Sequence, residues 1–377
     1  MINLFKKLIY NMNKLSLLAL SLILLFPFFR NNKSKNNEVE IIAVGDNLIH
    51  NSVLNSGRIN DSTYNFDRLF DVMRNDFQEA DIAIINQETI LGGDFMPYDG
   101  YPNFNSPNEL GDAIVKAGFD VVLQASNHTL DVGVKGVTNC IEYWKQQKGI
   151  TYLGINENQQ ERDEIKIIES KGIRFALLNY TYGLNGRTLP KDKKYLVNLI
   201  DTASIINDLR KAEKLADFTI VFPHWGVEYV YEPNKHQKSL AKIMTQYGAD
   251  LIIGTHPHVL QDIEWIESDN GNKSLCYYSL GNYTSGQKAT PRVLGGMAKV
   301  IIKNINDSIF IDKAELVPTI THYEWINGTS LHQTYKLSDY TETLEKRHSL
   351  NHYDSTFSFK NIQELADEIV GDWIANQ

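Results

Sequence analysis

Two histidines flank a proline at the end of an apolar run, in the stretch IIGTHPHVLQ from Ile252 to Gln261. Pro257 has a fixed φ and no N–H group, and it biases the preceding residue toward an extended backbone. Alternate residues of an extended chain point to the same side, so His256 and His258 are expected to face one place, with Cα atoms roughly 6–7 Å apart. The pair either binds a metal or consists of two histidines that are hydrogen-bonded or exposed.

Four segments, one of which leads into this histidine pair, share a pattern of aspartate, an apolar strand and then ligand-type side chains: ADIAIINQE, FDVVLQASNH, ADFTIVFPHWG and ADLIIGTHPH. The first strand, VEIIAVGD, ends in the same way. In open α/β sheets, sites form at the carboxyl ends of strands. We therefore expect these side chains to converge: Asp46, Asn86, Glu88, Asn127, His128, His224, His256 and His258.

The residue types at these strand ends favour metal-assisted hydrolysis. Carboxylate, amide and imidazole donors without thiolate suit a divalent transition metal, Mn, Fe or Zn. A carboxylate can bridge two ions, and two ions roughly 3.5–4 Å apart can hold a phosphoryl group and activate water. His128 is expected to protonate a leaving group, and Asp131, one helical turn later, to orient its imidazole. One or two ions are expected, bound by Asp46, Glu88, Asn127, His224, His256 and His258.

Each of these residues also has an interpretation that needs no metal. Asp46 fits a turn after glycine, Glu88 fits the protein surface, and Asn127 fits the N-cap of a helix. His128 fits the first turn of that helix, and His224 fits packing beside the next residue, a tryptophan. The sequence leaves these alternatives open.

Helical patterns alternate with short apolar strands, which predicts an α/β fold. One helix is expected within SPNELGDAIVKAG, opened by Ser106 and Glu109 in capping-box spacing. Others are expected from Asp201 and from Asn234, and a terminal helix over residues 361–375. Hairpin turns at residues 171–172 and 306–307 predict mixed sheets rather than purely parallel ones.

The composition limits the partners. The 377 residues, 42% of them hydrophobic, suffice for one large or two ordinary domains. A formal net charge of −9 argues against nucleic acid as a partner, and an anionic substrate would need a local positive charge such as a metal ion. Only Cys140 and Cys276 are present, so no disulfide framework is expected and both are interpreted as core residues.

The amino terminus predicts export. Residues 1–30 carry early lysines and then an uncharged stretch from Leu15 to Phe29, which fits a signal peptide or an uncleaved signal-anchor. No small-x-small cleavage site follows, so we expect a single membrane anchor at the cell membrane with the domain outside the cytoplasm. If the segment is cleaved, the protein is secreted or periplasmic. Residues 31–38 are expected to be a linker.

Six motifs in this order, VGD, NQE, SNHTLDVG, PHWGVEY, GTHPHVLQ and YSLGNY, resemble the CapA family of capsule, or poly-γ-glutamate, synthesis proteins. That family is similar to the calcineurin-like metallophosphoesterases. The resemblance covers roughly Glu40 to Val317. It implies a four-layer α/β/β/α sandwich with mixed sheets over residues 39–321, followed by a C-terminal extension, residues 322–377, with a terminal helix.

The resemblance also implies how the ligands divide. Glu88 would bridge, and Asp46 and His258 would belong to one metal. The other metal would take Asn127, His224 and His256, and His128 would be the general acid. The wider group has Asp-x-His in its first motif, whereas Leu48 stands at that position here and His50 two residues further on. One metal is therefore short of a ligand, so one ion or two are expected.

Three residues near these motifs are expected to contact substrate: Asn86, Glu228 and Asn282. Two functions follow from the motifs together. The first is an exported, membrane-anchored metallohydrolase that acts on a phosphoester or another anionic bond of a capsule polymer. The second is a non-catalytic metal-binding subunit of a membrane complex that synthesises or exports the polymer.

Overall fold

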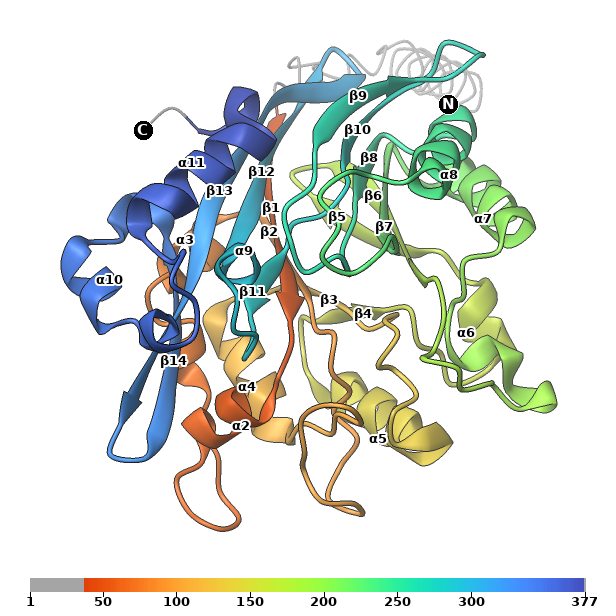
Figure 1. Cartoon of the computed structure of the whole chain (residues 1–377). Coiled ribbons are helices and arrows are strands. Elements are labelled where there is room, and N and C mark those ends of the chain that lie inside the picture. Colours follow the sequence, from red (N-terminus) through yellow and green to blue (C-terminus); the bar gives the residue numbers. More distant parts are fainter. Residues whose placement is uncertain (1–36, 376–377) are drawn as a thin grey trace, which may run out of the picture.

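Two mixed β-sheets lie face to face at the centre of the structure, a computed structural model that describes residues 37–375 (Figure 1). The mixed α/β class is as predicted. The signal segment expected over residues 1–30, and most of the expected linker, lie outside the described residues. Within residues 37–375, no helix is both long enough and apolar enough to cross a membrane.

The first sheet has eight strands. In spatial order they are β14 (Thr329–Lys336), β13 (Ser308–Ile326), β12 (Leu294–Ile305), β1 (Asn37–Asn47), β2 (Ile82–Asn86), β3 (Val121–Leu123) and β4 (Thr151–Leu153), with β11 (Asn282–Thr284) paired to the end of β1. The run from β1 to β4 is parallel, and β12 to β14 continue it as antiparallel neighbours.

The second sheet has six strands, and its central four are parallel. In spatial order they are β5 (Lys166–Ser170), β6 (Ile173–Thr181), β7 (Phe218–His224), β8 (Leu251–Ile253), β10 (Lys273–Tyr277) and β9 (Ile263–Glu267). The helices are α2 (Asn51–Gly57), α3 (Arg74–Glu79), α4 (Asn108–Ala117), α5 (Gly133–Gln146), α6 (Gln159–Asp163), α7 (Thr202–Leu215), α8 (Lys235–Gln246), α9 (Thr290–Val293), α10 (Glu342–Arg347) and α11 (Phe359–Val370).

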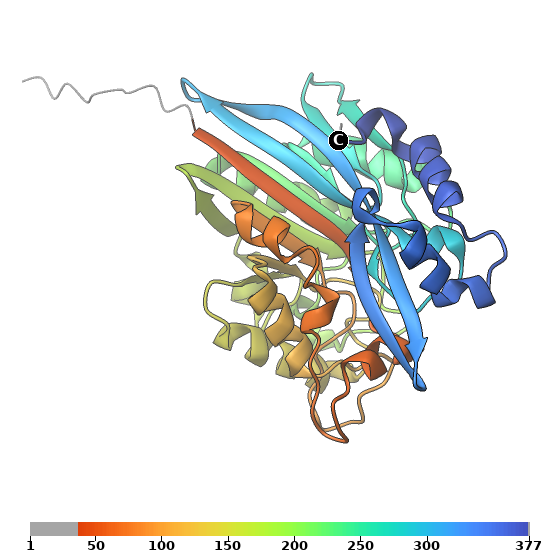
Figure 2. The same cartoon turned by 90° about the vertical axis from the view of Figure 1, so that its left-hand side faces the viewer.

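Three apolar cores form because successive residues of a strand point to opposite faces of its sheet. In β1, Ile41 faces the second sheet, whereas Ile42 packs against the helices α2 to α5. In β7, Ile220 faces the first sheet and Val221 packs against α7 and α8. Figure 2 shows α11 and the helices α2 to α5 on opposite sides of the first sheet.

The aspartates that open four of the strands have a common role. Each carboxylate accepts a hydrogen bond from a backbone N–H at the start of the neighbouring parallel strand. The four bonds join Asp81 to Glu40 (2.8 Å), Asp120 to Ala83 (2.8 Å), Asp217 to Arg174 (2.9 Å) and Asp250 to Thr219 (2.7 Å). Because each aspartate fixes where its strand begins against the next, it also fixes where the strand ends and where the ligand-type side chains lie.

Replacing Asp250 with asparagine is expected to stabilise the protein more at high pH than at low pH. Burial raises the pKa of Asp250 to about 7, from an ordinary value of 3.8, so the folded state holds this proton more tightly than the unfolded state. The wild type therefore loses stability as the pH rises through this window. Asparagine keeps an oxygen for the N–H of Thr219 and does not ionise. Relative to wild type, its free energy of unfolding should rise by on the order of 2 kcal/mol between about pH 5 and pH 8.

Urea unfolding at the two pH values measures this difference. Asp217→Asn is the matched control, because hydrogen bonding to Arg174 lowers the pKa of Asp217. The stability from that carboxylate is lost only in acid, so this variant should differ from wild type equally at both pH values. If the free energies of unfolding of Asp250→Asn and wild type also differ by the same amount at both pH values, burial of Asp250 does not oppose its ionisation.

The predicted element ends are confirmed at most positions. Asp201 and Asn234 cap α7 and α8, and Asn234 forms a full capping box. Both hairpin turns have two residues with positive φ, as a tight turn between twisted strands requires. The capping box at Ser106 was wrong. Pro107 occupies the N-cap position, and the hydroxyl of Ser106 instead bonds that of Thr89 at 2.8 Å.

The C-terminal residues belong to the first sheet and to the central core. The boundary expected between residues 321 and 322 lies inside β13. The terminal helix ends earlier than expected, at Val370, and a short 3-10 turn, Gly371–Trp373, follows it. Ile362 and Ala366 of α11 are buried in the core between the sheets. The last segment therefore covers the part of the first sheet that the second sheet does not reach.

Candidate metal centre

The carboxyl end of β1 contributes the first acidic side chain. Asp46 pairs in register with Asn86 of β2 on one side and with Asn282 of β11 on the other. Gly45 precedes it where the chains approach closely, because a Cβ there would lie 2.0 Å from the carbonyl oxygen of Gly281. The backbone N–H of Asp46 donates to that carbonyl at 2.9 Å. Only glycine allows this approach, so the position of the carboxylate depends on it.

The second sheet contributes three histidines. His224 is the last residue of β7, and His256 and His258 follow β8. The extended backbone expected around Pro257 was wrong. His256 has φ 98° and His258 has φ 58°, so the pair lies on a turn with left-handed backbone. Such backbone costs a non-glycine residue of order 1–3 kcal/mol and often accompanies functional sites.

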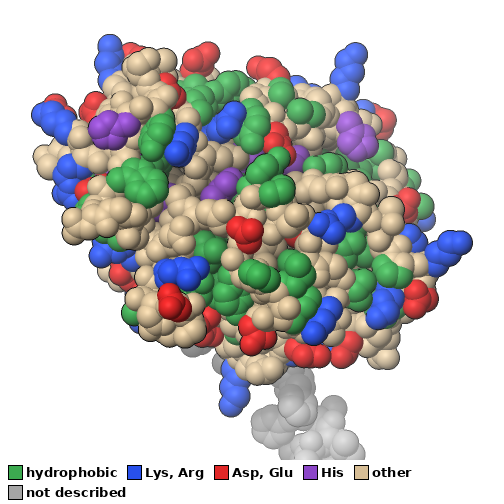
Figure 3. All heavy atoms as spheres, turned by 60° about the horizontal axis from the view of Figure 1, so that its bottom comes forward, with side chains coloured by type: hydrophobic (Ala, Val, Ile, Leu, Met, Phe, Trp, Pro, Cys, Tyr) green, Lys and Arg blue, Asp and Glu red, His purple; other side chains and the backbone are tan. Residues whose placement is uncertain are grey.

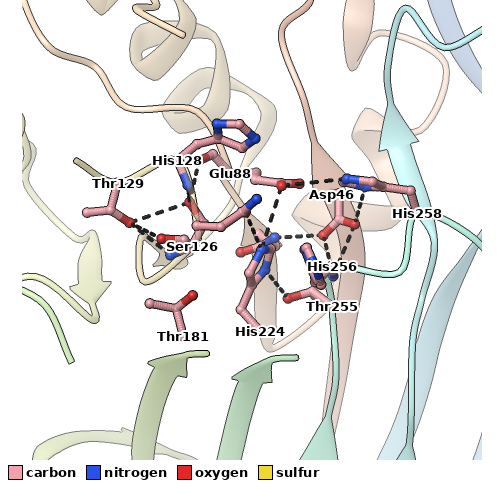
Figure 4. Close-up of polar contacts among 12 residues, drawn as sticks. Asp46, Glu88, Ser126, His128, Thr129, Thr181, His224, Thr255, His256 and His258 are labelled. Atoms are coloured by element: carbon pink, nitrogen blue, oxygen red, sulfur yellow. Dashed lines mark hydrogen bonds and ion pairs between the residues drawn. The ribbon is translucent and has the colours of Figure 1, made fainter. Parts of the chain in front are cut away.

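Asp46, Glu88 and His258 form a first group of ligand-type side chains. One ligand atom of each lies within 4.8 Å of the other two, and all three residues are buried. The Nδ1 atom of His258 is 3.0 Å from Oδ2 of Asp46, and its Nε2 atom is 3.8 Å from Oε1 of Glu88. Figure 4 shows His258 pointing at both carboxylates.

Glu88, His224 and His256 form a second group, in which one ligand atom of each residue again lies within 4.8 Å of the other two. Glu88 belongs to both groups. The Nε2 atom of His224 lies 3.6 Å from Oε1 of Glu88 and 2.9 Å from Oδ1 of Asn127. Its other nitrogen, Nδ1, bonds the hydroxyl of Thr255 at 2.9 Å. A histidine whose Nδ1 is held in this way presents Nε2 to a metal. Asn127 is not an N-cap, since α5 begins only at Gly133.

Unpartnered buried atoms show that the residues fit a metal. Both carboxylate oxygens of Glu88 and the Nδ1 atom of His256 are buried without a hydrogen-bond partner among the described residues. A buried polar group left unpaired is costly, so atoms of this kind need an explanation such as an ion. Mixed carboxylate and imidazole donors without thiolate suit Mn, Fe or Zn. The arrangement therefore fits one or two divalent transition-metal ions.

The charges of the centre point the same way. Burial raises the pKa of Glu88 well above its usual range, and the Asp46 carboxylate adds to this. Burial lowers the pKa of His224 and of His256 well below the usual value, so both stay neutral. Burial also lowers the pKa of His258, but the carboxylates of Glu88 and Asp46 outweigh it and raise the value to about 9. The two neutral imidazoles beside crowded carboxylates form a site that favours a cation, and metal binding would displace the proton of His258.

His128 lies beside these two groups, in the turn after β3. Its Nδ1 atom is 2.7 Å from Oδ2 of Asp131, the contact that the sequence predicted. The backbone N–H of Phe104 donates to the same carboxylate oxygen at 2.9 Å and helps to fix it. With Nδ1 bonded to a carboxylate, Nε2 is the nitrogen left to exchange a proton.

Asn185 is a site residue that the sequence did not indicate. Its Oδ1 atom accepts a hydrogen bond from Asn127 at 3.1 Å, and its amide nitrogen is 3.3 Å from Nδ1 of His128. It lies in a tight turn after β6 with φ 49°. An asparagine followed by glycine is a turn pattern, but nothing in the sequence places this turn beside the strand ends of the other sheet.

A cleft of about 690 Å³ opens beside the centre. Figure 3 shows histidine side chains in the middle of this face, between acidic and basic side chains. The residues that line the cleft are Tyr101, Pro102, Asn103, Asn127, His128, Asp131, Asn185, Gly186, Arg187, Glu228 and Tyr229. The cleft therefore connects the His128–Asp131 pair with solvent.

The three residues expected to contact substrate lie in different surroundings. Glu228 is exposed in the cleft. Asn86 and Asn282 are fully buried. The amide of Asn86 donates to Oδ1 of Asp46 at 2.7 Å, and Oδ1 of Asn282 is 3.1 Å from Nδ1 of His258. In this structure both asparagines hold proposed ligands in place.

Comparison with known proteins identifies the family. Residues 40–287 match the family described as bacterial capsule synthesis protein PGA_cap. The chain belongs to this capsule synthesis family. It is 33% identical over 191 residues to the capsule biosynthesis protein CapA of Bacillus anthracis, covering 49% of this chain and 44% of the relative. It is 34% identical over 171 residues to the PGA biosynthesis protein CapA of Bacillus subtilis (strain 168), covering 45% and 43%. The matched segments thus span less than half the length of each relative.

This capsule synthesis family member also resembles solved structures of phosphoesterases and nucleotidases. The calcineurin-like phosphoesterase YfkN of Bacillus subtilis has a TM-score of 0.42 and 12% identity, covering 88% of this chain and 99% of that one. The NAD nucleotidase of Haemophilus influenzae has a TM-score of 0.49 and 10% identity, covering 89% and 64%. These likenesses concern the fold alone.

One position departs from the wider phosphoesterase pattern, as the sequence indicated. Leu48 is buried where that pattern has histidine, and the nearby His50 is not part of either ligand group. The Nδ1 atom of His50 instead accepts a hydrogen bond from the N–H of Gly286 at 3.2 Å. Among the described residues each group has three carboxylate or imidazole side chains, and Asn127, whose Oδ1 atom is 2.9 Å from Nε2 of His224, would give the second group a fourth ligand.

Proposed function

We propose that this capsule synthesis family member is an exported, membrane-anchored metallohydrolase that acts on an anionic bond during synthesis of a capsule polymer of the poly-γ-glutamate type. One observation carries the proposal. Two buried ligand groups share Glu88, whose carboxylate oxygens have no hydrogen-bond partner among the described residues, and they lie beside an open cleft that contains a histidine–aspartate pair. The two mixed sheets, with helices packed on their outer faces, support the four-layer metallophosphoesterase-like sandwich that is part of this proposal.

The residues of the chain have separate roles in this proposal. When bound, divalent ions polarise the bond under attack and make water more acidic. Glu88, Asp46, Asn127 and the three histidines would hold those ions. The protonated imidazole of His128 donates its Nε2 proton to the departing oxygen or nitrogen, while Asp131 holds Nδ1 and stabilises the imidazolium form.

The lining of the cleft supports an anionic substrate, either a phosphoester or a carboxylate-bearing polymer. Arg187 is one of the residues that line the cleft, and its guanidinium donates a hydrogen bond to Oδ1 of Asn103 at 2.6 Å. That bond leaves further N–H groups of the guanidinium to bind an oxyanion. In a chain of net charge −9, this arginine and the metal ions would provide the local positive charge that an anionic substrate needs.

The second candidate is a non-catalytic metal-binding subunit of a membrane complex that synthesises or exports the polymer. The smaller donor set around Asp46 favours this alternative, because a metal held by few ligands is bound weakly. In both cases residues 1–30 would attach the domain to the membrane, with the domain outside the cytoplasm.

The two candidates are separated by metal analysis and hydrolysis assays on the full chain in detergent. We expect one to two equivalents of Mn, Fe or Zn per chain. We also expect hydrolysis of a generic phosphodiester or a γ-glutamyl peptide that stops on chelation and returns with added metal. A chain that binds metal but hydrolyses neither substrate supports the non-catalytic subunit. A chain that holds no transition metal under non-chelating conditions contradicts both.

A further inference from the structure

A third group of ligand-type side chains lies on the open side of the centre. A carboxylate oxygen of Glu228 and one nitrogen each of His256 and His258 lie within 4.8 Å of one another. Glu228 is in the loop after β7 and is exposed, whereas both histidines are buried. We propose that Glu228 is an additional metal ligand, bound from the solvent side. The inference rests on the metal centre proposed above.

Each of the three groups shares one residue with each of the other two. Glu88 joins the first two groups, and each of these contributes one histidine to the third. His258 comes from the group of Asp46, and His256 comes from the other. Glu88 is 1% exposed, whereas Glu228 lines the cleft, so Glu228 would reach the ions from the solvent-exposed side of the centre. Glu228 is therefore placed to reach either ion, including the one with the smaller donor set.

The backbone that follows Glu228 is fixed, although the side chain of Glu228 is exposed. The N–H of Tyr229 donates to the carbonyl of Pro257, between the two histidines, at 2.8 Å. Tyr229 has φ 67°, a conformation that needs support from its surroundings. The carbonyl of Val230 accepts from the side-chain amide of Gln261 at 2.7 Å. The loop is thus tied directly to the turn that carries His256 and His258.

The ring of Tyr229 is held as well. The guanidinium of Arg292 lies 3.6 Å from the ring centroid, and the amide of Gln287 donates to the tyrosine hydroxyl at 3.2 Å. These contacts order the residue next to Glu228 without neutralising its carboxylate. Among the described residues, the ion pairs at this cluster join His224 and His258 to Asp46 and Glu88, and none includes Glu228.

Charge also favours this role. Two divalent ions with Asp46 and Glu88 would leave an excess of about two positive charges, and a third carboxylate would reduce it to about one. Asparagine and histidine ligands do not change this balance. A carboxylate on the cleft side would also leave room for substrate, because an exposed side chain can move when an oxyanion takes its place.

Glu228→Gln tests the inference through metal binding rather than activity. Full-length wild type and variant are stripped with a chelator and titrated with Mn²⁺ and with Zn²⁺. Calorimetry and elemental analysis then give the affinity and the number of ions. We expect the variant to bind at least one ion ~10-fold more weakly or worse, or to lose it. Glu228→Asp should recover part of the affinity, since it keeps the carboxylate.

Glu232→Gln is the matched control. Glu232 lies in the same loop and is exposed, but it lines a different cavity together with residues of α11. The Glu232→Gln variant should bind metal ions in the same number and with the same affinity as wild type. If Glu228→Gln also matches wild type in number of ions and affinity, Glu228 is not a ligand, while the metal centre stands. A wild type that binds no ion overturns the centre and this inference together.

Discussion

Glu88→Gln is expected to lose metal binding almost completely, by at least ~100-fold in affinity, while the metal-free protein remains folded. Glutamine has nearly the same volume, so packing is preserved. It removes the one carboxylate that both ligand groups share. Burial already raises the pKa of this carboxyl well above its usual range, so in the metal-free chain burial opposes its charge more strongly than the nearby His258 favours it. Removing that charge should leave the melting temperature of the metal-free protein unchanged or higher.

The measurement combines metal content with thermal unfolding in chelator and in excess Zn²⁺. Wild type should melt at a higher temperature when metal is added, because a ligand that binds the folded state stabilises it. Glu88→Gln should show no such increase. Glu324→Gln is a control carboxylate outside the ligand groups, bonded to His322 and Arg347, and should keep the metal-dependent increase. An unchanged metal content in Glu88→Gln would show that Glu88 is not the shared ligand.

His128→Ala is expected to lower kcat by about 10²–10⁴-fold while metal content stays at the wild-type level. The effect should depend on the leaving group. A phosphodiester that releases nitrophenolate needs little protonation, whereas one that releases an alkoxide needs a proton from the protein. The loss should therefore be much larger for the alkyl ester. Because Asp131 bonds Nδ1 of His128, Asp131→Asn should show the same trend to a smaller extent.

Steady-state kinetics on a matched pair of aryl and alkyl phosphodiesters separates proton donation from other roles. Equal losses on both esters would mean that His128 binds substrate or supports the fold and does not act as the general acid. Thr138→Ala is a suitable reference, since Thr138 bonds the backbone of its own helix, outside the ligand groups. It should leave both rates close to wild type.

The sequence predicted which residues meet because the meeting depends on a repeated pattern. Each aspartate that opens a strand fixes the register with its neighbour. Each apolar strand then has a set length, and the donors at its end line up at one edge of the sheet. Asp46, Glu88 and His224 could be placed in this way without any knowledge of long-range contacts.

The sequence could not predict features that depend on which distant segment of the chain lies against a residue. The backbone of His256 was expected to be extended because proline restricts the residue before it, but contacts from both sheets hold it at φ 98°. Its N–H lies 3.2 Å from Oδ2 of Asp46, at the end of β1. Ser106 lost its expected cap because a partner on another loop, Thr89, was available. The place of Asn185 in the site could not be predicted for the same reason, since its turn adjoins a loop from the other sheet.

The left-handed turn at His256 and His258 has an evolutionary consequence. Glycine or asparagine would adopt this backbone more easily than histidine, so the two histidines occupy these positions at a cost in stability. Mutation tends to replace costly residues once selection on function relaxes. Relatives that keep both histidines should therefore still use the metal centre, whereas relatives with glycine or asparagine at these two positions should have lost it and kept only the fold.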